Sequence, residues 1–422
     1  MNVSSSLYRD SMVAFFLKLL SAGVALISNI YITNNLNIES AGAYFFMLAI
    51  ILFINPFGIL GLNNLVLKNI SRINSFSDRF IANSLMYRCV IVSFIFSTLI
   101  VAVFVFIWYG INSVFLVEGV SFQTFFYLIL SVPFFACGTI LCHGIQALGS
   151  PKISVLVSGP LFQSCIFFMF YFFNAKTPEL VALSYFLSAI GLFLTSLLFW
   201  MFNNGVRCGE QNSGFGIIND GFPFMSIQII GVVYISSSQV ILGYQGNLVE
   251  VAIFAICMKI SLMLSFILQA VNKIVAPQFS SLYHANQKSE LGLLVKRSTK
   301  LLILVTLPLV LFLICFASEI LQLFGDDYIA GYWILISLVL AQFFNICTGN
   351  VSFLLMMTGH EKFHRNNVAI ASIVSLIIGL LLIPKHTLFG ALIMVSSTLI
   401  LTNILSWWTV MKKLQINTFR FI

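Results

Sequence analysis

Long, uninterrupted apolar runs constrain this chain more than any other feature. A helix needs about 20 apolar residues to cross the roughly 30 Å of hydrocarbon in a bilayer, and about twelve such runs follow one another here. The runs do not alternate with polar residues as barrel strands do, and lipid offers backbone groups no hydrogen-bond partner, so they predict helices. The predicted fold is therefore all-α, a polytopic membrane protein with about twelve transmembrane helices. The predicted spans are approximately 12–32, 41–67, 85–107, 122–147, 152–173, 180–202, 222–242, 249–275, 299–318, 332–357, 367–384 and 388–411.

The composition leaves no room for a soluble domain. Charged residues make up 8% of the 422 residues, against about 25% in ordinary soluble domains. The connections are short, and the longest of them cover about 203–221 and 276–298. A polar tail with Arg9 and Asp10 precedes the first run, and no small-residue cleavage site follows it, so we expect an uncleaved span and not a removed signal peptide.

The positive charges predict the topology. With the N-terminus inside, sixteen of the 21 Lys and Arg fall on the inner side, and only Lys176 and Lys385 fall outside. Basic residues concentrate on the cytoplasmic side of membrane proteins. We therefore expect a multi-pass protein of a bacterial inner membrane with both termini in the cytoplasm. The net charge of +8 is explained by this topology, and no nucleic-acid partner is expected.

Matching landmarks indicate an internal repeat. Gly149 and Lys152 follow span 4, and Gly359 and Lys362 follow span 10, at an offset of 210 residues. A six-span repeat preserves the orientation of its helices in the membrane, as in transporters built from two halves. The expected architecture is two six-helix lobes, residues 1–205 and 206–422, around a central cavity.

Lysines inside the predicted spans are candidate substrate-binding residues. Lys259 lies nine residues beyond Glu250, about 14 Å into span 8, where a charge costs roughly 2.5–3.5 kcal/mol on insertion scales. Such residues usually face a cavity, although a contact with backbone carbonyls of another helix is the alternative. Lys18 shares one small, polar face of span 1 with Ser28 and Asn29. That face is equally suited to lining a cavity and to packing against another helix.

Four other polar residues are candidates with a simpler alternative. Lys273 and Arg88 lie near the inner ends of their spans, where anchoring at the interface is the default role. Gln342 and Asn345 lie one turn apart in span 10. Together with Ser28, these two amides suit a glycan, which is bound by many neutral hydrogen bonds, but such groups also join membrane helices to one another.

Enzymatic signatures are missing from the sequence. There is no GxxxxGK[ST], HExxH or GxSxG motif. His360 and His364 lie in a short basic loop, and the 8 cysteines form no CxxC pair, so neither a metal site nor another cofactor is expected. None of the 13 acids falls in the interior of a predicted span. We therefore expect no catalytic residues and no enzyme activity.

Short motifs along nearly the whole chain resemble those of Wzx-type O-antigen flippases. These are polysaccharide transporters of the multidrug/oligosaccharidyl-lipid/polysaccharide exporter superfamily. The matching stretches are Ser28–Thr33, Glu39–Tyr44, Pro56–Gly58, Leu67–Arg72, Gln146–Lys152, Pro277–Leu282, Phe324–Tyr328 and Met357–Lys362.

The resemblance implies export of a lipid-linked oligosaccharide on undecaprenyl diphosphate, from the cytoplasmic to the periplasmic leaflet. It implies that cations in the cavity, here Lys18 and Lys259, meet the diphosphate. Membrane lipids and other O-antigen assembly proteins, the polymerase and the chain-length regulator, are the implied partners. Two alternatives stay open: the O-antigen polymerase, which typically has long periplasmic loops that this chain lacks, and a drug or metabolite exporter of the same superfamily.

Overall fold

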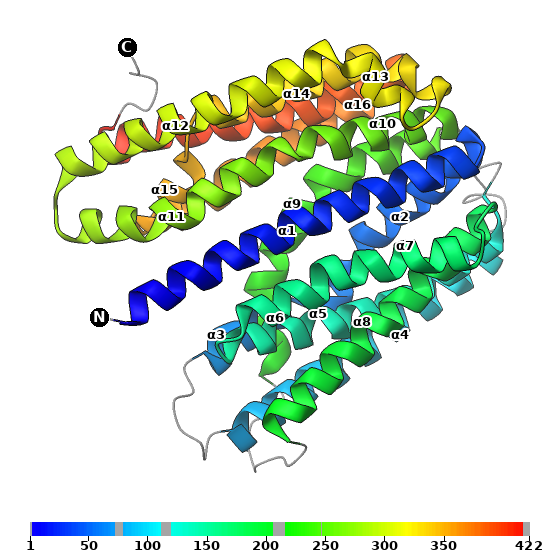
Figure 1. Cartoon of the computed structure of the whole chain (residues 1–422), viewed down its shortest axis with the longest axis horizontal. Helices are drawn as coiled ribbons and strands as arrows, with labels where there is room; N and C mark the ends of the chain where they lie inside the picture. Colours follow the sequence, from blue (N-terminus) through cyan, green and yellow to red (C-terminus); the bar gives the residue numbers. More distant parts are fainter. Residues whose placement is uncertain (1, 72–78, 111–119, 206–215, 246, 417–422) are drawn as a thin grey trace. The chain divides into compact units, whose positions relative to one another are not determined.

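The computed structural model describes residues 2–71, 79–110, 120–205, 216–245 and 247–416 (Figure 1). Within these ranges the regular structure is helical. Contacts divide the chain into two compact units, Met1–Val232 and Val233–Ile422, and α9 (Ile217–Tyr244) crosses the division. The predicted lobe boundary after residue 205 stays a prediction, because it follows the repeat and not these contacts.

The first unit is built around α5, which packs against α2, α3, α4 and α8. The helix α1 lies along the broken fifth span, in which α6, the π-helical segment η1 and α7 follow one another through Pro160. The helices of this unit besides the start of α9 are α1 (Asn2–Asn35), α2 (Ile38–Ile59), α3 (Leu62–Ile70), α4 (Arg79–Gly110), α5 (Phe122–Ala147), α6 (Pro151–Leu156), η1 (Val157–Leu161), α7 (Phe162–Phe172) and α8 (Pro178–Asn204).

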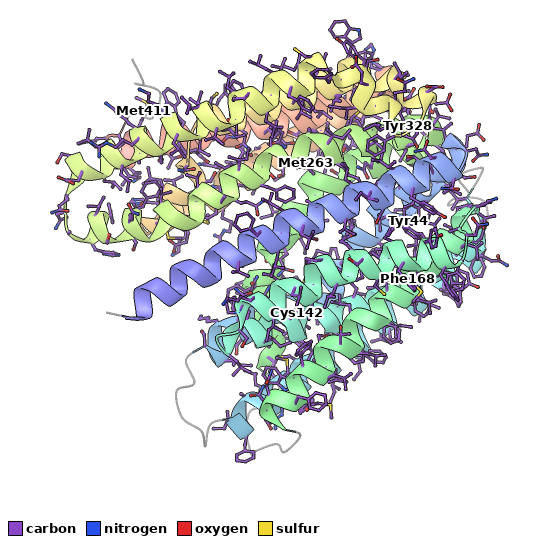
Figure 2. All side chains as sticks on the ribbon, viewed as in Figure 1. Tyr44, Cys142, Phe168, Met263, Tyr328 and Met411 are labelled. Atoms are coloured by element: carbon purple, nitrogen blue, oxygen red, sulfur yellow. The ribbon has the colours of Figure 1, made fainter. Side chains whose placement is uncertain are left out.

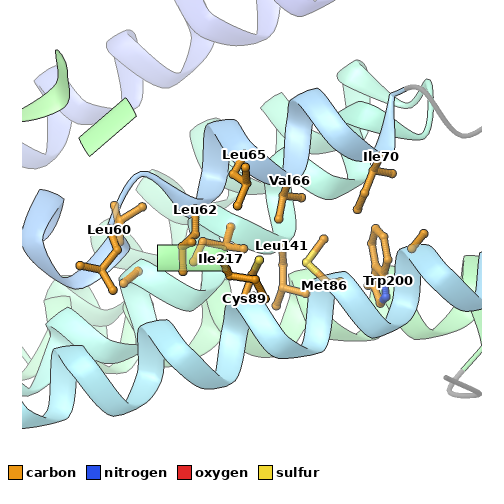
Figure 3. Packing of buried hydrophobic residues seen from close by; sticks show 14 of the residues in the cluster. Leu60, Leu62, Leu65, Val66, Ile70, Met86, Cys89, Leu141, Trp200 and Ile217 are labelled. Carbon is orange, nitrogen blue, oxygen red and sulfur yellow. The ribbon is translucent and has the colours of Figure 1, made fainter. Parts of the chain in front are cut away.

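A dense apolar cluster fixes α3 against α4 and α5. Leu62, Val66 and Ile70 project from one face of α3 toward Met86 and Leu141 (Figure 3). All five side chains are buried. Spacings of four residues place these α3 side chains on one helix face, so the short helix is held by packing.

The second unit contains a hairpin of α11 and α12 (Figure 1) and a layer in which α14 packs against α10, α12 and α16. The joint between α10 and α11 is Met263, marked in Figure 2. The elements of this unit besides the end of α9 are α10 (Leu248–Leu262), α11 (Leu264–His284), α12 (Lys288–Cys315), α13 (Ala317–Gln322), the 3-10 segment η2 (Asp326–Gly331), α14 (Tyr332–Cys347), α15 (Val351–Met357) and α16 (Glu361–Leu414).

The structure repeats itself at an offset of 210 residues. Both second spans begin after an asparagine cap, where Asn37 accepts a hydrogen bond from Ser40 N and Asn247 accepts one from Glu250 N. Equivalent turns also close alike, because Ser150 N donates to Ile145 O and His360 N donates to Leu355 O. Helix ends that lie 210 residues apart are Phe122 and Tyr332, Ala147 and Met357, Pro151 and Glu361, and Asn204 and Leu414.

The helices account for the twelve predicted spans. Ten helical stretches of the described chain are long and apolar enough to cross a membrane, and the bent α9 makes eleven. The helix α16 contains non-helical backbone at Thr387, where two helices join, and counting its arms separately gives twelve. The helix that contains predicted span 9 begins before that span, because α12 starts at Lys288. Its basic first turns are too polar for a hydropathy pattern yet remain helical.

The joint in α16 is held by a hydrogen bond within the second unit. Thr387 has φ 39° and ψ −109°, a conformation that a β-branched residue rarely adopts. Its hydroxyl donates to Glu250 Oε1 at 3.0 Å. The turn between the last two spans is therefore tied to the start of α10.

Carboxylates occupy the first turns of helices. Asp10 lies before Phe16, where the apolar part of α1 begins. The other acids in the described residues are Glu39, Glu179, Asp220, Glu250, Glu290, Glu319, Asp326, Asp327 and Glu361, each in the first turn of its element. A negative charge there complements the positive end of the helix dipole. No described acid lies in the interior of a membrane span.

Candidate functional site

The polar face of α1 packs partly against the fifth span. A Cβ placed on Gly159 of η1 would lie 3.4 Å from Ser21 Cβ, so the two helices are in close contact there. Lys18 lies one turn before Ser21 and is half-buried. Because the apolar part of α1 begins at Phe16, Lys18 is near the N-terminal end of the span and close enough to water for its amine to reach the interface.

The other two candidates on α1 bond to their own helix. The Ser28 hydroxyl is buried and donates to Val24 O at 2.9 Å. The Asn29 amide donates to Ala25 O at 2.5 Å. Such bonds to the preceding turn engage polar side chains within their own helix, and contact with a glycan stays a prediction for both residues.

The other two basic candidates, Arg88 and Lys273, have different surroundings. Arg88 is a half-buried residue of α4, next to Cys89 of the apolar cluster described above. Lys273 belongs to α11, but its side chain lies outside the described residues. Diphosphate contact stays a prediction for both residues.

Lys259 lies deep in an apolar helix of the second unit. It is half-buried in α10, and its neighbours Met258 and Ile260 are buried. The candidate span runs over Leu248–Asn272, which places Lys259 in its middle. The cation is thus far from either end of its span, as the sequence predicted. Lys18 and Lys259 belong to different units, and their facing one cavity stays a prediction.

Gln342 and Asn345 lie in a network of hydrogen bonds that joins α14 to the second arm of α16. Asn345 Nδ2 donates to Gln342 Oε1 at 3.3 Å, and Asn403 Nδ2 donates to Asn345 Oδ1 at 2.9 Å. The Thr348 hydroxyl lies 2.9 Å from Asn403 Oδ1 and donates to it. Gln342 is only 2% exposed. This arrangement matches the helix-joining alternative, while contact with a glycan stays a prediction.

The network ends at a break in span 10 that sequence analysis did not predict. Between α14 and α15, Gly349 has φ 79°, and a Cβ added there would collide with the Thr299 hydroxyl of α12. Glycine is therefore required both by the backbone conformation and by the neighbouring helix. The adjacent Asn350 donates to Ser298 Oγ at 3.3 Å, and its Oδ1 is buried without a hydrogen bond.

The first unit contains three further amides that are not among the predicted site residues. Gln228 Nε2 donates to Asn63 Oδ1 at 2.8 Å, which joins the start of α9 to α3. Asn55 on α2 is 4% exposed, and neither atom of its amide group has a hydrogen-bond partner. A polar residue beside the span-2 proline was the signal that could have identified Asn55.

Comparisons with known proteins identify the fold. No family model matches the chain, and no curated protein matches it. An inward-facing multidrug resistance MATE family transporter of the MOP superfamily superposes with a TM-score of 0.76 at 15% identity, over 96% of this chain and 98% of that one. The chain therefore has the same fold as this transporter. Lipid II flippase MurJ, in an inward closed conformation, superposes with a TM-score of 0.73 at 12% identity, over 94% and 87% of the two chains.

A third neighbour matches almost the whole chain. The MATE multidrug transporter DinF-BH gives a TM-score of 0.70 at 16% identity and covers 99% of this chain and 97% of that one. These matches confirm the predicted fold class, an all-α polytopic membrane protein with two lobes. The neighbours are described as transporters or flippases, and at such low identities the likeness concerns the fold.

Proposed function

We propose that this protein is a flippase for undecaprenyl-diphosphate-linked O-antigen repeat units. It moves them from the cytoplasmic to the periplasmic leaflet of a bacterial inner membrane by alternating access, with both termini in the cytoplasm. Two lines of support are the MOP superfamily fold, shared with lipid II flippase MurJ, and the motifs that resemble Wzx-type flippases. The proposal includes no cofactor and no catalytic residue.

The observation that carries this proposal is Lys259. It is a cation in the middle of a membrane helix, within a described structure whose spans hold acids only at their ends. A diphosphate crossing lipid needs fixed positive charge, and charge-assisted hydrogen bonds to phosphate are strong. In the proposed mechanism Lys259, assisted by Lys18, binds the diphosphate, while the hydroxyl and amide groups bind the sugars.

A second candidate is a drug or metabolite exporter, because two of the neighbours with this fold are multidrug transporters. An organic cation would be repelled by Lys259 and would find no carboxylate in the interior of a described span. Dye efflux from cells expressing the protein, undiminished in Lys259→Glu, would favour this candidate over the flippase.

The first test is a lipopolysaccharide gel from a strain that lacks the gene, with complementation. A flippase defect leaves lipid A–core without O-antigen, and undecaprenyl-linked repeat units accumulate inside. Core carrying one repeat unit would instead indicate the polymerase, because the unit has then crossed and only chain growth has failed. An unchanged ladder would contradict the proposal in a strain without a second flippase.

Charge variants at Lys259 test the residue itself. Lys259→Glu should abolish O-antigen export, Lys259→Met should reduce it strongly, and Lys259→Arg should retain most of it, with protein levels followed by immunoblot. Lys176→Glu, an exposed residue between α7 and α8, is the matched control. Full export by Lys259→Met at a normal protein level would exclude a diphosphate-binding role for this lysine.

A further inference from the structure

The helix α12 has a cationic end on its exposed side. Lys296, Arg297 and Lys300 lie within five residues of one another, and all three are exposed. No ion pair or hydrogen bond to another described residue holds any of the three. The opposite side of the helix, which includes Val295 and Leu302, is buried in the unit.

An apolar stripe continues directly from these cations along the same helix. Leu301, Leu304 and Leu311 are 51%, 69% and 53% exposed, so they face lipid in a membrane-spanning helix. From Lys300 to Phe312 the rise is about 18 Å, close to the roughly 15 Å of hydrocarbon in one leaflet. The exposed side of α12 thus presents positive charge at headgroup level and apolar surface over the depth of one leaflet.

The repeat shows that the fold does not require these cations. At the offset of 210 residues, the corresponding positions of α4 hold Met86, Tyr87 and Val90, and Met86 is fully buried. Both helices have the same place in their repeats, yet only α12 carries the three charges.

Along α12 itself, negative charge near the three cations is sparse. Glu290 is the acid of the first turn of α12. It lies seven residues before Arg297, which is two turns, or about 10 Å, nearer the start of the helix. On this part of α12 the three positive charges outnumber the one acid, Glu290, and the exposed side of the helix therefore suits an anion.

We propose that this end of α12 binds an anionic phospholipid of the inner leaflet. The phosphate lies among Lys296, Arg297 and Lys300, where the Arg297 guanidinium donates two parallel hydrogen bonds and the lysines add point charges. One acyl chain lies along Leu301, Leu304 and Leu311. This inference does not depend on which substrate the protein transports.

The test uses the purified full-length protein and measures lipid binding directly. Phosphatidylglycerol is titrated into detergent-solubilised, delipidated protein, and bound lipid is counted by native mass spectrometry. Each basic residue near a membrane surface contributes enough attraction for K296Q/R297Q/K300Q to weaken the tightest phosphatidylglycerol site on the order of a hundredfold. Phosphatidylcholine, which carries no net charge, should not occupy that site.

A matched variant separates a local site from general charge. K362Q/K412Q/K413Q removes the same charge from the inner ends of α16, where Lys412 lies over Trp408 and Lys413 over Phe363. It should bind phosphatidylglycerol as the wild type does. Equal weakening in both triple variants, wild-type affinity in K296Q/R297Q/K300Q, or a site that takes farnesyl diphosphate but not phosphatidylglycerol would each overturn the proposal.

Discussion

Span 4 and span 10 occupy the same place in the two repeats, but the polar side chains of the two spans have different hydrogen-bond partners. The helix α5 is continuous from Phe122 to Ala147, whereas the corresponding stretch from Tyr332 to Met357 is broken between α14 and α15. In α5, the Ser131 hydroxyl donates to Leu128 O of the same helix. In span 10, Asn345 and Thr348 also bond to Asn403 of α16, and Asn350 bonds to Ser298 of α12. A shared register of 210 residues therefore supports one packing helix and one polar junction.

This difference indicates how strongly each of the two spans depends on its neighbouring helices. A helix whose polar groups bond to its own backbone depends on its neighbours mainly for packing. A broken helix whose polar groups bond to α12 and α16 depends on them for hydrogen bonds, and interhelical hydrogen bonds in membranes contribute about 0.6 kcal/mol on average and up to about 1.7. Small movements of span 10 would exchange these bonds, so we expect the second unit to be the more responsive to substitution.

The largest effect is expected at the break. Gly349→Ala should lower the free energy of unfolding by about 2–5 kcal/mol, because alanine meets Thr299 and adopts a left-handed conformation. Gly149→Ala and Gly359→Ala test the conformation alone, since both have positive φ and nothing lies within 4 Å of an added Cβ. They should lose only about 1–2 kcal/mol.

Unfolding in mixed micelles measures these differences. Adding Thr299→Ala to Gly349→Ala should recover the stability lost to the steric clash, while the stability lost to the left-handed backbone conformation should remain lost. If Gly349→Ala were no worse than Gly359→Ala, the close approach to α12 would have no energetic weight, and the break would be a local feature of the backbone.

An intermediate effect is expected in the network. Asn403→Leu leaves Asn345 Oδ1 without its donor and leaves the Thr348 hydroxyl only its bond to Asn345 O, so the free energy of unfolding should fall by about 1–3 kcal/mol. Ser131→Ala in span 4 should change it by less than about 1 kcal/mol, because no second helix loses a bond. Equal losses measured for the two variants would remove the distinction between a packing helix and a polar junction.

The smallest effect has the opposite sign. Asn55→Leu replaces a buried amide that has no hydrogen-bond partner with an apolar group of similar size. The free energy of unfolding should increase by up to about 1 kcal/mol, and the melting temperature should rise with it. A lower melting temperature would show that Asn55 is paired in a way that this conformation does not display. Loss of export without loss of stability would assign Asn55 a role in transport.

The spans were predictable because hydropathy reports each helix separately. The prediction of 332–357 for span 10 matches the ends of α14 and α15, and the division near Thr387 follows the polar residues Lys385 and His386. The break at Gly349 could not be predicted in this way, since apolar residues continue on both sides of it.

Contacts between helices could not be predicted from the spacing of residues in the sequence. Spacing placed Gln342 and Asn345 on one face, but it could not indicate Asn403, which lies 58 residues after Asn345. The same limit applies to Lys259, because its position along α10 follows from counting residues while its surroundings depend on helices distant in sequence. The depth of a polar group is readable from sequence, and its partner is not.

The tie between Thr387 and Glu250 has a consequence for biosynthesis. The two residues are 137 positions apart, and a ribosome adds roughly 5–20 residues per second. Glu250 is therefore synthesised about 7–27 s before Thr387. A single non-helical residue joins the final pair of spans, and the acceptor that ties this turn has been synthesised before the turn itself.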